Sequence, residues 1–367
     1  MQFRDLHRQY DAMRAEMDEA LLKAAHSGAY IMGPQVAELE QQLADYVGVK
    51  HCITCANGTD ALRLALMALN IGPGDAVFVP DFTFFATAEV VAMTGATPIF
   101  VDVDKDTYNI DIHDLRKKYY DLIEQEGLLP RAVIAVDLFG QPANYEQLIE
   151  ECHGLVMNLI EDGAQGFGGA IGNSKACSFG DIATTSFFPA KPLGCYGDGG
   201  ALFTDDDYCA DLLRSLRVHG KGTDKYDNVR LGLNSRLDTL QAAVLQVKFS
   251  HFEDELKAVN RIAQKYDELL AGKVKTPVVP EGYTSSWAQY TIQTDHRDEL
   301  QARLKAAGIP SMVYYPRTMS QQTAFACLHQ NPCPMAEQLP KTVLSLPMHP
   351  YLTDEEIEHI AAIVLTT

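Results

Sequence analysis

The middle of the chain alternates between short apolar segments and amphipathic segments from about residue 50 to residue 161. The apolar segments are predicted strands at 52–56, 76–80, 98–103, 132–138 and 155–161. The amphipathic segments between them are predicted helices at 59–69, 87–93, 111–124 and 144–152. Helices that connect consecutive strands imply parallel pairing, and parallel sheets bind ligands at the carboxyl ends of their strands. We therefore expect an α/β protein with a mostly parallel central sheet.

The segments on either side of this region complete a two-domain plan. Two helices are predicted before it, at 12–26 and 35–47, with a glycine- and proline-containing break at 28–34. Two short strands follow it at 182–188 and 200–204, and their close spacing allows one of them to run antiparallel.

A long amphipathic helix is expected from residue 236 to about residue 272, and it leads into a smaller α+β region. The elements expected there are a strand at 285–294, a helix at 297–307, a strand at 310–315 and a final helix at 353–365. The domain boundary is placed inside the long helix, giving a large domain at 1–250 and a small C-terminal domain at 251–367.

Composition excludes several classes of protein. A net charge of −19 argues against a nucleic-acid binder, and it implies that an anionic substrate would meet only a few local cations. Eight cysteines in 367 residues indicate reduced thiols and a cytoplasmic protein. Cys52 and Cys55 have metal-like spacing but no second ligand pair, so no metal site is expected. The sequence shows neither a secretory signal nor an apolar run of membrane-spanning length, so no membrane association is expected.

Lys191 lies on a short glycine-rich loop that follows the predicted strand at 182–188. An amine held at the end of a sheet can form a Schiff base with a carbonyl cofactor, most often pyridoxal 5'-phosphate (PLP). Taken alone, the segment also fits a solvated loop lysine. Asp162 follows the strand at 155–161 and could hold the protonated pyridine nitrogen of PLP, or merely cap the next turn. Together, the two residues favour a PLP site.

Other strand ends carry candidates for the rest of such a site. Gly58 and Thr59 stand between a predicted strand and helix, where backbone amides and the helix dipole favour a phosphate, although simple helix capping is equally compatible. Ser186, which precedes Lys191, is a further phosphate donor. Phe84 could stack on the pyridine ring, although aromatic residues at strand ends more often belong to the core. No dinucleotide or P-loop fingerprint is present.

Five segments in this order resemble the DegT/StrS-type sugar aminotransferases, which are aspartate-aminotransferase-like (fold type I) PLP enzymes. They are residues 58–62, 81–84, 161–165, 186–191 and 197–200. The resemblance continues to residues 345–350, so it covers essentially the whole chain.

The resemblance implies a role for each candidate residue. Lys191 would carry the internal aldimine and move the proton between the substrate carbon and the cofactor, while Asp162 would bind the pyridine nitrogen and Gln165 would lie near the ring hydroxyl. The remaining implied cofactor contacts are Gly58, Thr59 and Ser186 at the phosphate and Phe84 on the ring face.

The resemblance also implies a homodimer with shared active sites. The segment 234–238 matches the segment that the neighbouring subunit contributes to the active site in this family, with Asn234 at the phosphate and Arg236 at the substrate. Asn234 could also cap the long helix that follows it.

Within this family the chain is most similar to enzymes that aminate C3 of UDP-2-acetamido-2-deoxy-3-oxo-glucuronate with L-glutamate as donor, a step in surface polysaccharide (lipopolysaccharide/O-antigen) biosynthesis. That group commonly has Ser and His where this chain has Ala190 and Tyr314. These departures leave the exact keto nucleotide sugar open, including a 4-keto-6-deoxy or another 3-keto sugar. The substrate-side candidates are Tyr30, Arg236, Tyr314 and Tyr315.

Two rival interpretations are weaker. Related sugar dehydratases have histidine at the lysine position, so Lys191 argues against dehydration. A non-catalytic regulator on the same fold would not need Lys191 together with Asp162, although the fold alone does not exclude it.

Overall fold

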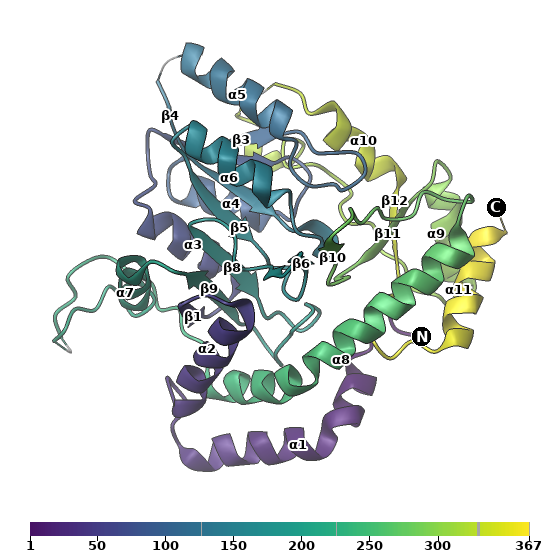
Figure 1. Ribbon diagram of the computed structural model, residues 1–367, viewed down its shortest axis with the longest axis horizontal. Coiled ribbons are helices and arrows are strands. Elements are labelled where there is room, and N and C mark those ends of the chain that lie inside the picture. The colour runs from purple at the N-terminus through teal and green to yellow at the C-terminus, as the bar shows by residue number, and fades with distance from the viewer. Residues whose placement is uncertain (126, 225, 329–330, 367) are drawn as a thin grey trace.

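A seven-stranded sheet forms the centre of the computed structural model, which describes residues 1–125, 127–224, 226–328 and 331–366. Its strand order is β1-β9-β8-β5-β4-β2-β3 (Figure 1). The strands are β1 (His51–Cys55), β2 (Asp75–Pro80), β3 (Thr97–Val101), β4 (Leu129–Val136), β5 (Asn158–Asp162), β8 (Ile182–Ser186) and β9 (Gly200–Thr204). β9 is antiparallel to β1 and to β8, and every other neighbouring pair is parallel. The prediction of a mostly parallel sheet with one antiparallel strand is confirmed.

Helices cover both faces of this sheet. They are α3 (Gly58–Ala68), α4 (Ala86–Met93), α5 (Ile112–Gln125), α6 (Tyr145–Gly154) and α7 (Asp207–Leu216), of which α7 was not predicted. Alternate residues of each strand supply the two cores: Val77 packs with α3 and α4, whereas Phe78 packs with α5 and α6. Strands buried on both faces read as continuous apolar runs, which is why the sequence located them.

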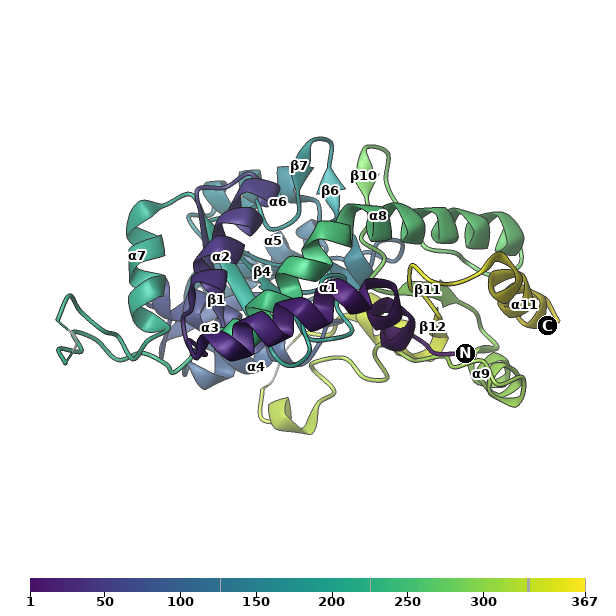
Figure 2. The same cartoon turned by 90° about the horizontal axis from the view of Figure 1, so that it is seen from below.

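Three further helices, α1 (Leu6–Ser27), α2 (Pro34–Val47) and α8 (Thr239–Leu270), pack together at the β1–β9 end of the sheet (Figures 1 and 2). Pro34 occupies the first turn of α2 and Gly48 ends it at φ 87°, the left-handed conformation that glycine adopts without strain.

α8 joins two hydrophobic cores. Leu245 and Phe252 pack against the large sheet, whereas Ile262 and Tyr266 pack into a separate core with the C-terminal elements. Figures 1 and 2 show α8 running from the side of α2 to the region of α11. We propose that the domain boundary near residue 250 lies within this helix.

The C-terminal region contains β10 (Tyr283–Thr284), β11 (Tyr290–Gln293), α9 (Arg297–Ala306), α10 (Pro334–Thr342), β12 (Val343–Leu346) and α11 (Asp354–Leu365). β11 pairs with β12, and β10 pairs with β6 (Ala170–Ile171), which in turn pairs with β7 (Ser174–Lys175). Short 3-10 turns lie at Leu138–Gly140 and Thr323–Phe325.

Three predicted strands differ from the structure. Of the strand predicted at 285–294, only Tyr290–Gln293 forms a strand, β11. The strand predicted at 310–315 is wrong, since only Met312 forms an isolated bridge there, and β12 is the partner of β11 instead. Proline at both 310 and 316 removes backbone donors and explains this. The strand predicted at 155–161 begins only at Asn158, because Val156 is 88% exposed with a φ of 55°.

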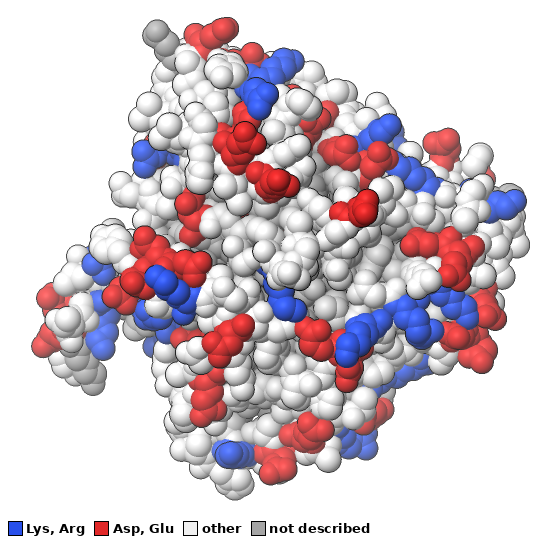
Figure 3. All heavy atoms as spheres, viewed as in Figure 1, with Lys and Arg blue, Asp and Glu red and all other residues white. Residues whose placement is uncertain are grey.

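The surface carries both signs of charge. Figure 3 shows acidic and basic side chains interspersed over the face seen in Figure 1. In the described part of the chain, no helix is both long enough and apolar enough to span a bilayer.

A leucine pair tests the core assignment. Leu64→Ala removes a fully buried side chain on α3, so the free energy of unfolding should fall by about 2–5 kcal/mol in urea denaturation. Leu129→Ala, at a residue that is 64% exposed, should cost roughly 0.5 kcal/mol or less. Equal losses from the two variants would contradict the assignment.

Candidate active site

Asp162 lies at the carboxyl end, and Lys191 just beyond the carboxyl end, of two adjacent parallel strands. Asp162 is the last residue of β5 and pairs in register with Thr184 of β8, which leads to Lys191. Burial lowers the pKa of Lys191 to about 8, the negative charge of Asp162 opposes this shift, and the positive charge of Arg4 adds to it. A lysine with this pKa is partly neutral near physiological pH, as a nucleophile or a base requires.

The carboxylate of Asp162 is buried and held at both oxygens. Thr87 Oγ1 of α4 donates to Oδ2 at 2.9 Å, and the amide of Ala164 donates to Oδ1 at 3.2 Å. Burial raises the pKa of Asp162, while the bond from Thr87, the charge of Lys191 and the bond from Ala164 lower it. A carboxylate offers about four acceptor positions, so this one can still accept a further charged N–H donor.

The N-terminus of α3 lies against β8. Asn57 caps the helix by accepting from the amide of Asp60 at 2.8 Å, and the amides of Gly58 and Thr59 precede the first intrahelical bonds. A Cβ atom at Gly58 would stand 2.7 Å from the Cβ of Ser186. The structure therefore brings Gly58, Thr59 and Ser186 together, with the helix dipole favouring an anion.

Aromatic and amide side chains border the same strand ends. Gln165 accepts from the amide of Phe139 at 2.6 Å and donates from Nε2 to the hydroxyl of Tyr315 at 3.0 Å. The rings of Phe84 and Tyr315 are 6.1 Å apart, and those of Tyr314 and Tyr315 are 5.6 Å apart. Phe84 is 53% exposed, so its ring can contact a bound ligand.

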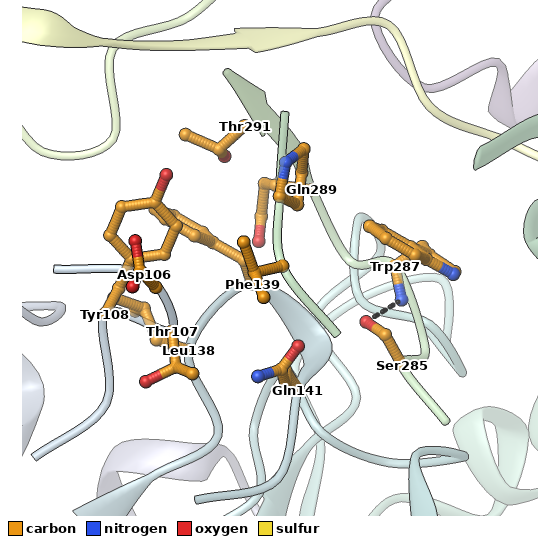
Figure 4. A pocket seen from close by; sticks show the side chains of 12 residues that line it. Asp106, Thr107, Tyr108, Leu138, Phe139, Gln141, Ser285, Trp287, Gln289 and Thr291 are labelled. Carbon is orange, nitrogen blue, oxygen red and sulfur yellow. Dashed lines mark hydrogen bonds between the residues drawn. The ribbon is translucent and has the colours of Figure 1, made fainter. Parts of the chain in front are cut away.

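A small cavity lies on the other side of Phe139 (Figure 4). It separates the loop at 106–108 from the segment at 285–291, where the amide of Trp287 donates to Ser285 Oγ at 3.1 Å. Its volume of about 20 Å³ suits roughly one water molecule. A cofactor therefore does not fit there.

Three further predicted site residues belong to other segments of the chain. The hydroxyl of Tyr30 donates to Ala25 O at 3.1 Å. Asn234 forms a bridge with Val218 at the base of a projecting arm, residues 218–224 and 226–234 (Figure 1). Among the residues described, no hydrogen bond or ion pair links Tyr30, Asn234 or Arg236 to Lys191 or Asp162.

The expectation that Asn234 could cap the long helix is wrong. α8 begins at Thr239, and Asp238 occupies its N-cap position.

Two residues at the site were missed by sequence reasoning. Thr87 lies on α4, and its hydroxyl is 3.2 Å from that of Thr83 in the loop before the helix, within the segment at 81–84 that was singled out from the sequence. Arg4 donates from Nη2 to Lys191 O at 2.8 Å across 187 residues of sequence, and no local pattern signals such a contact.

The donors and acceptors present fit PLP. An amine suits the aldehyde, a buried carboxylate suits the pyridine nitrogen, and a helix N-terminus beside a hydroxyl suits the phosphate. The sheet and this set of residues define a fold type I PLP-dependent transferase.

Comparisons with known proteins give the family. The model of the DegT/DnrJ/EryC1/StrS aminotransferase family matches residues 11–365, and the chain belongs to this family. The chain is a PLP-dependent sugar aminotransferase.

Similar proteins span the full length of the chain. It is 43% identical to the UDP-2-acetamido-2-deoxy-3-oxo-D-glucuronate aminotransferase of Pseudomonas aeruginosa, with 99% of each chain covered. It is 42% identical to a UDP-N-acetyl-3-dehydro-alpha-D-glucosamine 3-aminotransferase of Acidithiobacillus ferrooxidans, covering 99% of this chain and 96% of the relative. A crystal structure of a DegT DnrJ EryC1 StrS aminotransferase from Brucella abortus superposes with a TM-score of 0.98 at 50% identity, covering 99% and 98% of the two chains.

The charge interaction between Asp162 and Lys191 can be tested in the cofactor-free chain. Because the carboxylate favours the ammonium form, Asp162→Asn should lower the pKa of Lys191 below about 8, by roughly one pH unit. The pH profile of Lys191 acylation, followed by peptide mass spectrometry, measures it. Asp211→Asn, which removes an exposed acid on α7, is the control and should leave the profile unchanged. An unchanged profile in Asp162→Asn would show that the two groups do not interact.

Proposed function

We propose that this enzyme transfers the amino group of L-glutamate to C3 of a keto nucleotide sugar of the UDP-2-acetamido-2-deoxy-3-oxo-glucuronate type. The full-length identity of 43% to an enzyme named for that substrate carries the proposal. The product would enter surface polysaccharide (lipopolysaccharide/O-antigen) biosynthesis, in the cytoplasm.

Lys191 and Asp162 would perform the central steps. PLP, when bound, supplies an electron sink for the substrate carbanion. Lys191 would attach the cofactor and then, as a free amine, carry a proton to and from the reacting carbon, a role that its pKa of about 8 suits. Asp162 would keep a proton on the pyridine nitrogen, and its bond from Thr87 fixes the carboxylate for this purpose.

The neighbouring residues would fix the plane and position of the cofactor. Gly58, Thr59 and Ser186 would bind the phosphate, because they meet where α3 starts. Phe84, whose side chain is exposed, would stack on the pyridine ring of PLP. Gln165 would lie at the ring hydroxyl, oriented by its bonds to Phe139 and Tyr315.

The substrate side would be formed by Tyr30, Arg236, Tyr314 and Tyr315. Burial raises the pKa of both Tyr314 and Tyr315, so their hydroxyls stay protonated and can donate to sugar oxygens. Arg236 would supply the local cation that an acidic sugar needs on a protein with a net charge of −19.

We further propose that two copies of the chain complete each other's sites. Among the described residues, Tyr30, Asn234 and Arg236 form no hydrogen bond or ion pair with Lys191 or Asp162 of the same chain. The arm, residues 218–224 and 226–234, projects beyond the body of the molecule (Figures 1 and 2). Val229 and Leu231 on this arm are 53% and 91% exposed. Exposed apolar side chains on a projecting segment suit burial against a second copy.

A substrate panel tests the proposed reaction. With L-glutamate as donor, 3-keto UDP-hexuronates should be aminated at least about tenfold faster, in kcat/KM, than 4-keto nucleotide sugars. Arg236→Met should reduce this preference by raising KM for sugars that carry a carboxylate. Higher kcat/KM for 4-keto-6-deoxy sugars would contradict the proposed substrate while leaving aminotransfer intact.

A mixing experiment tests the shared site. Lys191→Ala should be nearly inactive alone, and Arg236→Ala should show little activity when the 3-keto UDP-hexuronate is supplied well below the raised KM of that variant. Equal amounts refolded or co-expressed together should recover about a quarter of wild-type activity, because half of the dimers are mixed and each has one intact site. Failure to exceed the sum of the separate variants would contradict a site built from two subunits.

A further inference from the structure

The N-terminal segment, residues 3–8, is anchored to the C-terminal region of the chain. The amide of Met348 donates to Phe3 O at 3.2 Å, and the ring of Phe3 packs edge-on at 6.1 Å from that of Tyr314. Arg8 forms a two-bond pair with Glu356 at 2.9 and 2.8 Å. Figures 1 and 2 both show the N-terminus beside α11. These contacts fix the segment in place.

Arg4 reaches from this segment to the loop that carries Lys191. Its Nη2 atom donates to Lys191 O at 2.8 Å and to Pro192 O at 3.3 Å. On its other side the loop is closed by its own backbone, since the amide of Lys191 donates to Phe188 O at 2.8 Å. Pro192 has no amide hydrogen, so no regular ladder can hold the chain here. Arg4 is therefore the side chain that fixes these two carbonyls.

Arg4 occupies an environment that is costly for a cation. Burial lowers its pKa, and the nearby negative charge of Glu255 offsets this only in part. Among the residues described, no carboxylate forms an ion pair with Arg4. A buried charge without an ion pair lowers stability unless other bonds compensate, and the hydrogen bonds of Arg4 go to the Lys191 loop.

Two other buried bases face the same region. Lys248 on α8 is 1% exposed, its Nζ has no hydrogen-bond partner, and burial lowers its pKa to about 8. Neither ring nitrogen of His349 has a partner, and burial lowers the pKa of His349 to about 4, so it is neutral at physiological pH. Arg4 thus remains the permanent cation beside the loop.

We propose that Arg4 is a positioning residue of the active site, whose guanidinium holds the main chain at Lys191 and Pro192 and so sets where the lysine amine stands relative to Asp162. The inference rests on the proposed role of Lys191 as the cofactor attachment point. Through Phe3, the same segment connects this loop to Tyr314 on the substrate side. The positive charge of Arg4 also favours the neutral amine of Lys191 by lowering its pKa.

Two variants separate the hydrogen bonds of Arg4 from its charge. Arg4→Gln removes the charge, so the pH midpoint of Lys191 acylation in the cofactor-free full chain should rise by roughly one unit. Arg4→Lys keeps the charge but loses the planar guanidinium with its paired N–H donors. The pH midpoint of Lys191 acylation should therefore stay near that of wild type. In both variants, amide hydrogen exchange in the 188–200 peptide should become several-fold faster.

Arg14→Gln is the matched control, because it removes an arginine that is 59% exposed and paired with Asp11 on α1. Midpoints and exchange rates in both Arg4 variants equal to those of this control would overturn the inference. If Arg4→Gln does not fold, Arg4→Lys still decides through the exchange rate.

Measurements on the holoenzyme distinguish the proposed role of Lys191 from the proposed role of Arg4. Its visible absorbance should titrate at a higher pH in Arg4→Gln than in wild type. A wild-type protein without cofactor on Lys191 would refute the proposed role of this lysine, while the acylation and exchange measurements on the cofactor-free chain would still decide the role of Arg4.

Discussion

The interaction between the Lys191 amine and the Asp162 carboxylate, both partly removed from water, is the constraint on which the site depends. Burial acts on the two groups in opposite directions, lowering the pKa of the lysine and raising that of the acid, and their mutual attraction restrains both shifts. The result is an amine that can lose its proton near physiological pH beside an acid that remains a strong acceptor. A solvent-exposed pair would have neither property.

The parallel sheet makes this arrangement possible. Parallel pairing of β5 with β8 brings their carboxyl ends to one edge of the sheet. β1 and β2, which run in the same direction, lead there to the N-termini of α3 and α4. From these helices come the phosphate-facing amides of Gly58 and Thr59 and the hydroxyl that fixes Asp162. The order of the strands therefore determines where the site lies, and individual side chains determine its detailed geometry.

Segments distant in sequence contribute side chains that set the detailed geometry of the site. Residues 313–343 contribute Tyr315, which accepts from Gln165, and Phe325 and Leu339, which enter the core of the large sheet. The N-terminal segment contributes Arg4. Segments from both ends of the chain thus contact the site, with Arg4 bonded at the loop of Lys191 and Tyr315 bonded to Gln165.

The parts predicted from the sequence are those with a local signal. The five alternating strands were located because each is an apolar run between helices. Lys191, Asp162, Gly58 and Ser186 could be proposed as site residues because each lies near a strand end within a short motif. Local signals fail where a contact is distant: β12 was missed because its pairing with β11 depends on a partner some fifty residues away. Arg4 has no motif at all, and Asn234 was expected at a helix start that lies at Thr239.

The most direct measurement is borohydride reduction of the holoenzyme followed by peptide mass mapping. The account predicts that the pyridoxyl group is found on the peptide containing Lys191. Lys248 is the natural competitor, since its buried amine also has a pKa of about 8. A pyridoxyl group on Lys248, or an unmodified Lys191 peptide, would contradict the assignment of the active site.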